Sequence, residues 1–292
     1  MSTQRPQRLD SAGPFLWIAT WLWALSFIAA RYEAPGGLSA FTVIGGRTLL
    51  AATCFALMAA FGKVSTIPRR DMALLFAVAA SGQFGYLLLF HLGAAGATAA
   101  TASLLINLSP VIGTVASALW LHDHLSTLNK VGVALAVAGT IPVSLADGGG
   151  IRLSASIGYL LAAAVLAGIF VVASKPLVDR HGAMTVTAWG WWLSTPLALL
   201  FVPTMVRELP DAGSSALTAL LFLGLGSSVV AYLAWGHGLV RTDASVASAY
   251  LFAVPVIAVL GAWIILGERP GPATAIGGAI ALCGVALATR RG

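Results

Sequence analysis

The sequence is poor in charge and in cysteine. Only 9% of its 292 residues are charged and only two are cysteine, whereas 59% are hydrophobic and the mean hydropathy is +0.92. A chain with so little polar surface cannot cover a soluble globule. Cys54 and Cys283 both fall within apolar runs, so a disulfide framework or a thiolate metal site is not expected. The composition therefore indicates an integral membrane protein.

Acidic residues are also scarce. All ten Asp and Glu residues fall in predicted tails, loops or helix ends, so the sequence predicts no carboxylate in the middle of the membrane for proton exchange. No Walker lysine motif is present, which argues against ATP hydrolysis, and no cofactor or metal is expected. His91 and His237, at predicted helix ends, could titrate near neutral pH, although a histidine at such a place is more often interfacial.

The apolar residues form runs long enough to cross a bilayer, which takes about 20 residues. The first run follows Arg5 and Arg8, as in a signal peptide, but nine further runs favour an uncleaved first helix. The sequence predicts an all-α membrane protein with ten transmembrane helices, at residues 14–31, 38–61, 72–92, 97–120, 128–146, 154–174, 184–206, 215–236, 244–266 and 273–289.

Lys and Arg are distributed unevenly between the two sides of these helices. One side carries 11 of the 16 and the other 4, with Arg47 inside the second helix. Short cytoplasmic loops carry the excess of positive charge in membrane proteins, so both termini are expected in the cytoplasm. The expected location is the inner membrane, which the chain crosses several times. The net charge of +6 follows from this asymmetry. The expected surroundings are a lipid bilayer, with no nucleic acid partner.

Two motifs recur at a fixed spacing. SLLINLSP, ending at Pro110, is echoed by SAYLFAVP, ending at Pro255, and the same offset of 145 positions relates Gly132 to Gly277 and Gly139 to Gly284. The spacing predicts two five-helix repeats, residues 14–146 and 154–289, after a tail of residues 1–13. Because five is odd, the second repeat is expected to be inverted, as in many secondary transporters.

These residues also carry a resemblance to a known family. The segment ASLLINLSPVIGTVASALWLHDHLSTLNKVGVALAVAGT and its counterpart ASAYLFAVPVIAVLGAWIILGERPGPATAIGGAIALCGV resemble the paired signature of EamA-type transporters of the drug/metabolite transporter superfamily. The likeness extends over nearly the whole chain, with His122, Asp123 and His124 departing from the usual turn. The resemblance implies a metabolite transporter, most often an exporter of amino acids or related compounds, that works without ATP.

Asn107 and Pro110 lie in the middle of the fourth predicted helix. An unsatisfied amide is costly at mid-bilayer, so Asn107 is expected to face protein or a water-filled cavity. Pro110 removes a backbone donor and is expected to kink the helix, as is Pro255 in the second repeat. Phe252 replaces Asn107 there, which predicts a cavity with one polar and one apolar side. The alternative is that Asn107 only bonds a neighbouring helix.

Two further equivalent positions are polar. Gln83, with Tyr86 on the adjacent turn, corresponds to Ser228, with Tyr232 one turn later. These four residues are candidates for substrate binding or for structural hydrogen bonding between helices. Ser26 in the first helix is a weaker candidate, because a serine can bond to its own helix backbone.

The remaining candidates are aromatic or basic. Trp189 and Trp192 share a helical face and could stack on a substrate, although tryptophan near a helix end is more often an interfacial anchor. Arg47 could meet a substrate carboxylate. A structural role is favoured, in which Arg47 snorkels to the outer headgroups or bonds helix-end carbonyls.

Four functional classes remain open after these observations. A secondary transporter that exports amino acids or related small metabolites through a midplane cavity leads. A multidrug efflux transporter is the alternative. A membrane-embedded enzyme fits less well because no intramembrane carboxylate pair or metal cluster is predicted. A passive channel fits less well because kinked helices at matched positions favour alternating access. A small-molecule substrate is expected, and a monomer is plausible.

Overall fold

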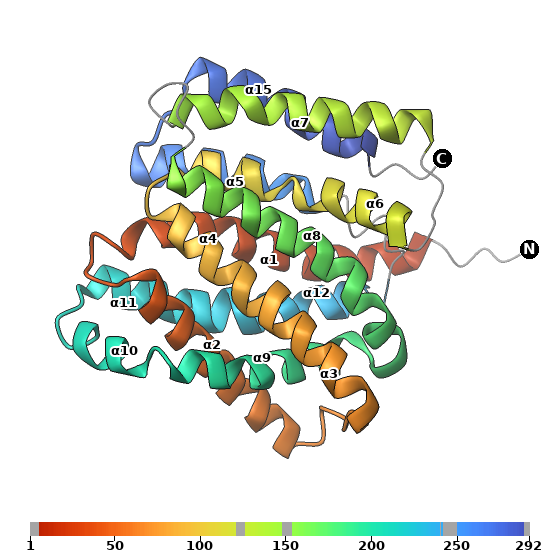
Figure 1. Cartoon of the computed structure of the whole chain (residues 1–292), viewed down its shortest axis with the longest axis vertical. Helices are drawn as coiled ribbons and strands as arrows, with labels where there is room; N and C mark the ends of the chain where they lie inside the picture. Colours follow the sequence, from red (N-terminus) through yellow and green to blue (C-terminus); the bar gives the residue numbers. More distant parts are fainter. Residues whose placement is uncertain (1–5, 121–125, 148–153, 240, 242–249, 289–292) are drawn as a thin grey trace, which may run out of the picture.

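The computed structural model describes residues 6–120, 126–147, 154–239, 241 and 250–288. Every regular element among these residues is helical, and the helices run across the longest axis of the molecule, several of them obliquely (Figure 1). The motif His122 to His124 and Ser248 lie outside the described residues. The chain is therefore all-α, as its composition requires.

The first half of the chain contains the helices up to Asp147. Helix α1 begins at Pro6, where a proline suits the first helical position, so it includes part of the segment expected as a tail. The elements are α1 (Pro6–Ala29), η1 (Ala30–Tyr32), α2 (Ala40–Ala60), α3 (Arg69–Val78), η2 (Ala79–Gly85), α4 (Tyr86–Ala94), α5 (Ala99–Ile106), α6 (Ser109–Trp120) and α7 (Thr127–Asp147).

The second half begins at Ser154, whose side chain accepts a hydrogen bond from the N–H of Ile157 and caps the next helix. Its described elements are α8 (Ala155–His181), α9 (Ala183–Leu199), α10 (Val202–Glu208), α11 (Ser214–Leu221), η3 (Phe222–Val230), α12 (Ala231–Leu239), α14 (Ala253–Gly261), η4 (Ala262–Leu266) and α15 (Pro272–Ala288).

Six of these helical stretches are long and apolar enough to cross a membrane. A seventh is the pair α9 and α10, which is bent by 73°. Shorter apolar helices cover Thr127–Val143, Ala253–Leu266 and Pro272–Ala288. Large apolar side chains such as Phe61 and Ile264, both 79% exposed, cover the outside of the bundle. A surface of this kind is stable in lipid, and the chain is a multi-pass membrane protein.

Helices from the two halves pack against one another. Helix α1 packs along α12 and α14, α8 packs along α4 and α6, and α2 packs along α9 and η3. Helices α7 and α15 lie side by side as an outer layer (Figure 1). Gly132 and Gly284 allow the two backbones to touch, because a Cβ at either position would overlap the backbone of the other helix. The buried polar side chains at the centre of the bundle come from α1, α2, α4 and η3.

Three described stretches are wider and π-helical, namely η2, η3 and η4, and two helices are interrupted. The π segments η2 and η3 end at Gly85 and Val230, which are 145 positions apart. Helix α5 ends before Asn107 and α6 starts at Ser109, while α14 starts directly after Phe252. Pro110 and Pro255 lie just inside the new helices, where the missing N–H breaks no helical hydrogen bond. Such irregular turns are frequent at functional sites.

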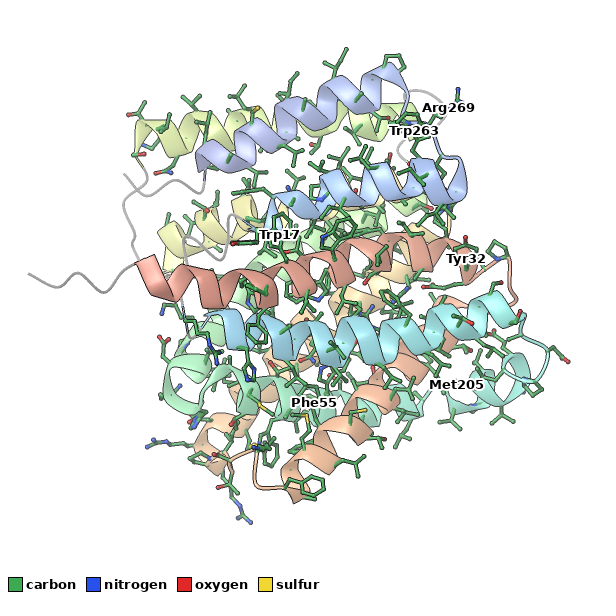
Figure 2. The ribbon with its side chains drawn as sticks, turned by 180° about the vertical axis from the view of Figure 1, so that it is seen from behind. Trp17, Tyr32, Phe55, Met205, Trp263 and Arg269 are labelled. Atoms are coloured by element: carbon green, nitrogen blue, oxygen red, sulfur yellow. The ribbon has the colours of Figure 1, made fainter. Side chains whose placement is uncertain are left out.

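The two ends of the bundle differ in charge. One end, here called the basic end, is where α1 begins and α8 ends (Figure 1). The last turns of α8, the loop after α2 and the start of α3 carry Lys63, Arg69, Arg70, Lys175 and Arg180. Tyr32 and Arg269 lie toward the opposite end (Figure 2). At the basic end Arg180 bonds to Asp71 at 2.7 Å, which ties the end of α8 to the start of α3.

Candidate functional site

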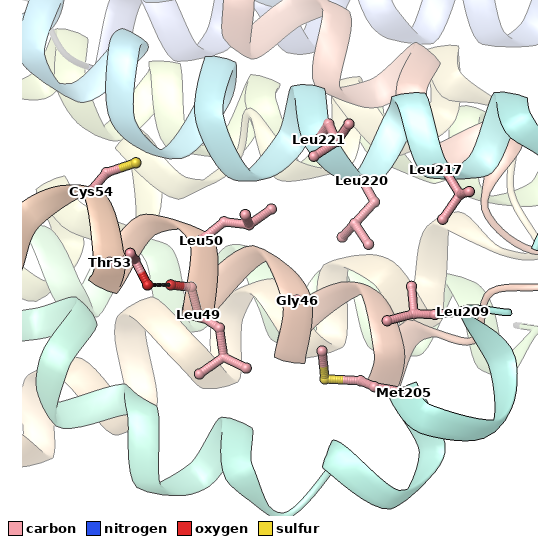
Figure 3. A pocket seen from close by; sticks show the side chains of 10 residues that line it. All are labelled: Gly46, Leu49, Leu50, Thr53, Cys54, Met205, Leu209, Leu217, Leu220 and Leu221. Atoms are coloured by element: carbon pink, nitrogen blue, oxygen red, sulfur yellow. Dashed lines mark hydrogen bonds between the residues drawn. The ribbon is translucent and has the colours of Figure 1, made fainter.

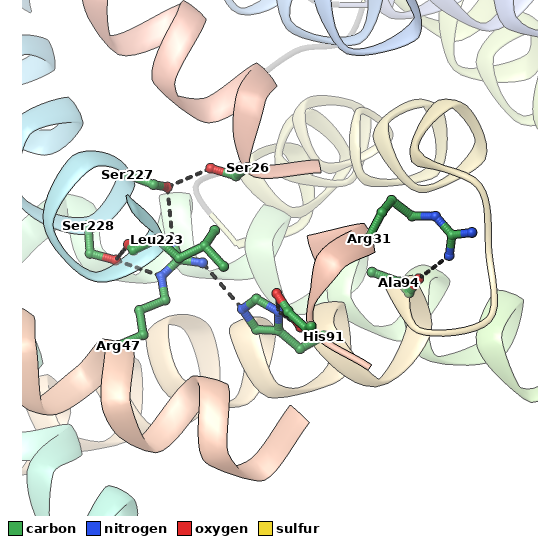
Figure 4. Close-up of polar contacts among 9 residues, drawn as sticks. Ser26, Arg31, Arg47, His91, Ala94, Leu223, Ser227 and Ser228 are labelled. Atoms are coloured by element: carbon green, nitrogen blue, oxygen red, sulfur yellow. Dashed lines mark hydrogen bonds and ion pairs between the residues drawn. The ribbon is translucent and has the colours of Figure 1, made fainter. Parts of the chain in front are cut away.

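Arg47 is the centre of a buried polar network. Its guanidinium is only 3% exposed although it projects from the apolar helix α2. Its Nε donates to the Oγ of Ser228 at 2.6 Å, and its Nη2 donates to the Oγ of Ser227 at 3.0 Å (Figure 4). Ser228 in turn donates to the carbonyl of Leu223, five positions earlier in the π segment η3. The π segment therefore presents two adjacent hydroxyls to one cation.

His91 continues this network on the other side of Arg47. The Nη1 of Arg47 lies 3.4 Å from the Nε2 of His91, and the Nδ1 of His91 lies 2.9 and 3.0 Å from the two carboxylate oxygens of Glu33. Arginine only donates hydrogen bonds, so Nε2 must accept and the proton must sit on Nδ1. Glu33 is then the ionised acceptor. We call Glu33, His91, Arg47, Ser227 and Ser228 the polar relay.

The first helix joins the polar relay through a serine. The Oγ of Ser26 lies 2.8 Å from the Oγ of Ser227 and 2.9 Å from the carbonyl of Leu22 on its own helix. The indole of Trp23 also donates to the backbone carbonyl of Ser227 at 3.2 Å. The relay consequently connects α1, α2 and α4 with η3 in the second half of the chain.

A cavity opens at the basic end, between α2, α9 and α12. It has a volume of about 420 Å³. Apolar walls come from Phe55, Met184, Leu233 and Trp235, and polar groups from Thr185, Thr187, Tyr232, His237 and Arg241. Arg241 also lies over the ring of Phe15 at 5.4 Å. This cavity, here called the vestibule, has the size and the mixture of walls that small-molecule sites have.

A smaller chamber of about 80 Å³ lies deeper, and it shares Ala183, Thr187 and Tyr232 with the vestibule. Gln83 lines this inner chamber and is 4% exposed. Its Nε2 has no hydrogen-bond partner among the described residues. Gly190 leaves the space that the amide occupies, because a Cβ there would overlap the Oε1 of Gln83. A buried amide with free donors is costly unless a ligand or water accepts from it.

The end of the bundle opposite the basic end is tied by polar contacts. Glu268 bonds to the Nε of Arg31 at 2.7 Å and accepts from the N–H of Ala99 at 2.9 Å. Glu208 accepts from the N–H and the Oγ of Ser39 at 2.8 and 2.9 Å. These contacts join η1 and α5 to the loop after η4, and the start of α2 to α10.

An apolar groove runs along the outside, between α2, α10 and α11 (Figure 3). Its volume is about 510 Å³, and leucines dominate its walls. The hydroxyl of Thr53 is used within its own helix, because it donates to the carbonyl of Leu49 at 2.8 Å. The groove therefore offers no free polar group to orient a polar metabolite.

The residues singled out from the sequence fall into three groups. Ser26, Arg47 and Ser228 meet in or beside the polar relay, and Gln83 and Tyr232 line the inner chamber. Tyr86 lies within electrostatic range of Arg47. The others lie outside the vestibule and the inner chamber; they are Asn107, Phe252, Trp189 and Trp192 with the kink residues Pro110 and Pro255.

One expectation needs correction. The idea that Arg47 snorkels to the headgroups is wrong, because its side chain is buried and bonded to two serines. The indole N–H groups of Trp189 and Trp192 donate to the backbone carbonyls of Ser65 and Ala52 at 3.0 Å each, so these two residues tie α9 to α2 and its following loop. Asn107 is buried, and its Nδ2 has no partner among the described residues.

Sequence reasoning missed Glu33 and Trp191 in this region, and it favoured an interfacial place for His91. Glu33 was placed among the loop carboxylates, yet it is 4% exposed and pairs with His91, which is fully buried. Trp191 is also fully buried, and its ring meets Tyr232 edge to face at 6.5 Å. No local pattern reveals the pair of Glu33 and His91, because the two residues are 58 positions apart.

Comparisons with known proteins agree with this fold. The EamA-like transporter family model matches residues 12–145 and again residues 154–290. A probable terminal-alkyne amino-acid exporter of Streptantibioticus cattleyicolor is 32% identical over 92% of this chain and 90% of its own. The aromatic amino acid exporter YddG of Ancylobacter novellus is 30% identical over 71% of this chain and 73% of its own.

A solved crystal structure has the same fold. It matches with a TM-score of 0.67 at 23% identity, over 96% of this chain and 98% of its own. The two family matches together extend over most of the chain. The chain therefore belongs to the EamA-like transporter family.

Proposed function

We propose that this protein is a secondary transporter that exports amino acids with apolar or aromatic side chains by alternating access. The observation that carries the proposal is the vestibule, which leads from the basic end to the unpaired amide of Gln83. The opposite end is tied at the same time by Arg31 with Glu268 and by Ser39 with Glu208. A site open to one side and closed to the other is what alternating access requires.

Two inverted repeats of five helices would supply the moving parts. The packing supports this architecture, because exchanging equivalent helices of the two halves preserves the main contacts. The packing of α1 on α12 corresponds to that of α8 on α4, and that of α2 on η3 corresponds to that of α9 on η2. The π segments and the helix interruptions recur at the same offset of 145 residues.

The walls of the vestibule support the choice of substrate. Phe55, Met184 and Trp235 offer apolar surface for a side chain, and Arg241 offers a positive charge for a carboxylate. No Asp or Glu is among the described residues that line the vestibule, and Asp243, two positions after Arg241, lies outside the described residues. The described walls offer a lipophilic cation no countercharge, which supports amino acids over multidrug efflux. The printed names of two relatives, both amino-acid exporters, agree with this choice.

The membrane orientation is part of the proposal. With the basic end in the cytoplasm, as the positive-inside rule predicts, the vestibule faces the compartment from which an exporter takes its substrate. The proposed location is the cytoplasmic membrane with both termini inside. The partners are the small-molecule substrate and the lipid bilayer, and one chain contains the whole site. An enzymatic role is not proposed, since the named relatives are transporters and exporters.

Ligand-dependent stability tests this function. A ligand that binds the folded state raises the unfolding temperature, and the shift grows with the logarithm of the ligand concentration above its Kd. We expect L-phenylalanine or propargylglycine to raise the unfolding temperature of the detergent-purified protein, and lysine and tetraphenylphosphonium to leave it unchanged. The shift should vanish in Gln83→Ala but persist in Ser81→Ala, which alters an exposed serine of the same π segment. Stabilisation by the cation alone would reject the amino-acid proposal.

A further inference from the structure

We propose that His91 is a proton-binding site, so that protonation of this residue is coupled to the transport cycle. The inference rests on the proposed function only for the coupling; the proton site itself stands on the polar relay. His91 is fully buried and lies between a cation and a carboxylate, with its two ring nitrogens engaged by Arg47 and Glu33. A histidine so placed has two charge states with different hydrogen-bond partners.

Few other ionisable groups surround this imidazole. Helix η2 and helix α5 contribute none, and α2 contributes only Arg47. Helix α8 brings Leu160 and the backbone of Ser156 against the next turn, at Gly93. From η1 and its end come Glu33 and Arg31, and Arg31 is engaged with Glu268 and the carbonyl of Ala94. Tyr86 on the same helix and Tyr232 lie within electrostatic range of Arg47.

The neutral relay has a defined proton arrangement. Arg47 donates to Nε2, Nδ1–H donates to Glu33, and the charges of Arg47 and Glu33 balance. The Oε1 of Glu33 lies 2.9 Å from Nδ1 but has no donor in hydrogen-bond geometry. The carboxylate therefore holds spare acceptor capacity beside the imidazole, which would stabilise an imidazolium.

A proton from water can bind only at Nε2, because Nδ1 already carries one. The Nε2 lone pair then forms an N–H bond, and Nε2–H and the Nη1–H groups of Arg47 face each other as two donors. The contact between Arg47 and His91 must break, whereas the ion pair between His91 and Glu33 becomes stronger. Binding of one proton thus breaks the contact between Arg47 and His91 and strengthens the contact between His91 and Glu33.

This exchange reaches the boundary between the two halves of the chain. Arg47 holds Ser227 and Ser228 of η3 with the other side of its guanidinium. A change in its position therefore acts on the packing of α2 against η3. His91 has no exposed surface while the end opposite the basic end is closed. It must therefore exchange its proton when that end opens. Protonation and opening are consequently linked.

Nuclear magnetic resonance of the purified full-length protein, labelled with ¹³C at histidine Cε1, tests the proton site without any substrate. The signal that is absent in His91→Gln should change in a single step over the pH range in which the protein stays folded. Glutamine keeps an acceptor for Arg47 and a donor for Glu33 but cannot bind the proton. If that variant does not fold, Glu33→Gln identifies the signal, because it changes the group that contacts this imidazole. A His91 signal that is constant over this range overturns the proposal.

Transport measurements test the coupling. In proteoliposomes, uptake of L-phenylalanine by the wild type should change several-fold over the same pH range, and uptake by His91→Gln should not. His181→Gln is the matched control, since His181 also contacts a carboxylate, Asp71, but lies outside the relay; it should keep the wild-type profile. A pH dependence that persists in His91→Gln overturns the coupling and leaves the proposed function standing. If L-phenylalanine is not transported, the proposed function fails and the resonance experiment alone decides the proton site.

Discussion

Arg47 and Ser228 are joined by a 2.6 Å hydrogen bond across the boundary between the two halves of the chain. They lie 181 positions apart, one on the straight helix α2 and the other in the π segment η3. Because Ser228 donates its own proton to Leu223, its oxygen is free to accept from the guanidinium. A regular helix would not offer that carbonyl five positions back. The irregular backbone and the buried cation therefore depend on each other.

Arg47→Met should destabilise the protein by about 3 to 5 kcal/mol, because it leaves the carboxylate of Glu33 buried without its balancing charge. The double variant Arg47→Met with Glu33→Gln should recover part of this loss. Unfolding of all four proteins of this double-mutant cycle in the same detergent measures the coupling. Additive losses would show that the two charges do not interact through His91.

Gln83→Met should change stability and transport in opposite directions. The substitution removes a buried amide whose Nε2 has no partner, so the free energy of unfolding should rise by about 1 kcal/mol. Transport of L-phenylalanine should fall at least tenfold, since the ligand loses its donor in the inner chamber. Chemical denaturation and uptake are measured on the same preparation. A stability loss with normal uptake would make Gln83 a structural residue.

Glu268→Ala should open the end opposite the vestibule more than Arg31→Ala does. Glu268 bonds both Arg31 and the N–H of Ala99 at the start of α5, whereas Arg31→Ala leaves the second bond in place. Opening is measured with Ala97→Cys in a background without Cys54 and Cys283, because Ala97 is only 4% exposed. The rate at which this cysteine reacts with a membrane-impermeant maleimide reports how often the end opens. Equal labelling rates in the two variants would show that the contact with Ala99 has no role in closure.

Gly284→Ala should destabilise the outer layer. Its Cβ would overlap the backbone nitrogen of Ala136, and separating α7 from α15 to make room costs about 1 to 3 kcal/mol. Gly158→Ala in α8 is the matched control, because nothing lies within 4 Å of the added Cβ. It should stabilise by about 0.5 to 1 kcal/mol through helix propensity. The unfolding temperature should fall in Gly284→Ala and rise in Gly158→Ala. Similar unfolding temperatures in the two variants would argue against a close approach of α7 and α15.

Much of the architecture can be predicted from the sequence, because hydropathy alone sets where helices cross a membrane. The predicted ranges lie within a few residues of most observed helices, and the helix interruption falls at Asn107, just before Pro110. The main differences are at α1, which begins at Pro6, at α8, which continues to His181, and at the seventh predicted helix, which is bent by 73° between α9 and α10. Hydropathy does not mark the ends of α1 and α8; Pro6 at the start of α1 and Gly182 after α8 do.

The site is less predictable, because its contacts depend on packing between distant segments. Gln83 and Ser228 stand out as polar residues at equivalent mid-membrane positions, and both prove to lie in π segments. Trp189 and Trp192 look like stacking residues, yet their N–H groups are used by backbone carbonyls. The burial of Glu33 follows only from the position of His91 on another helix.

Counterflow in proteoliposomes tests the central claim most directly. Vesicles loaded with unlabelled L-phenylalanine are diluted into a trace of labelled L-phenylalanine, and the label inside is followed over time. The account predicts a transient accumulation of label above equilibrium in the wild type and in Ser81→Ala, and none in Gln83→Ala. Equilibration without accumulation in the wild type would indicate a channel and would contradict alternating access.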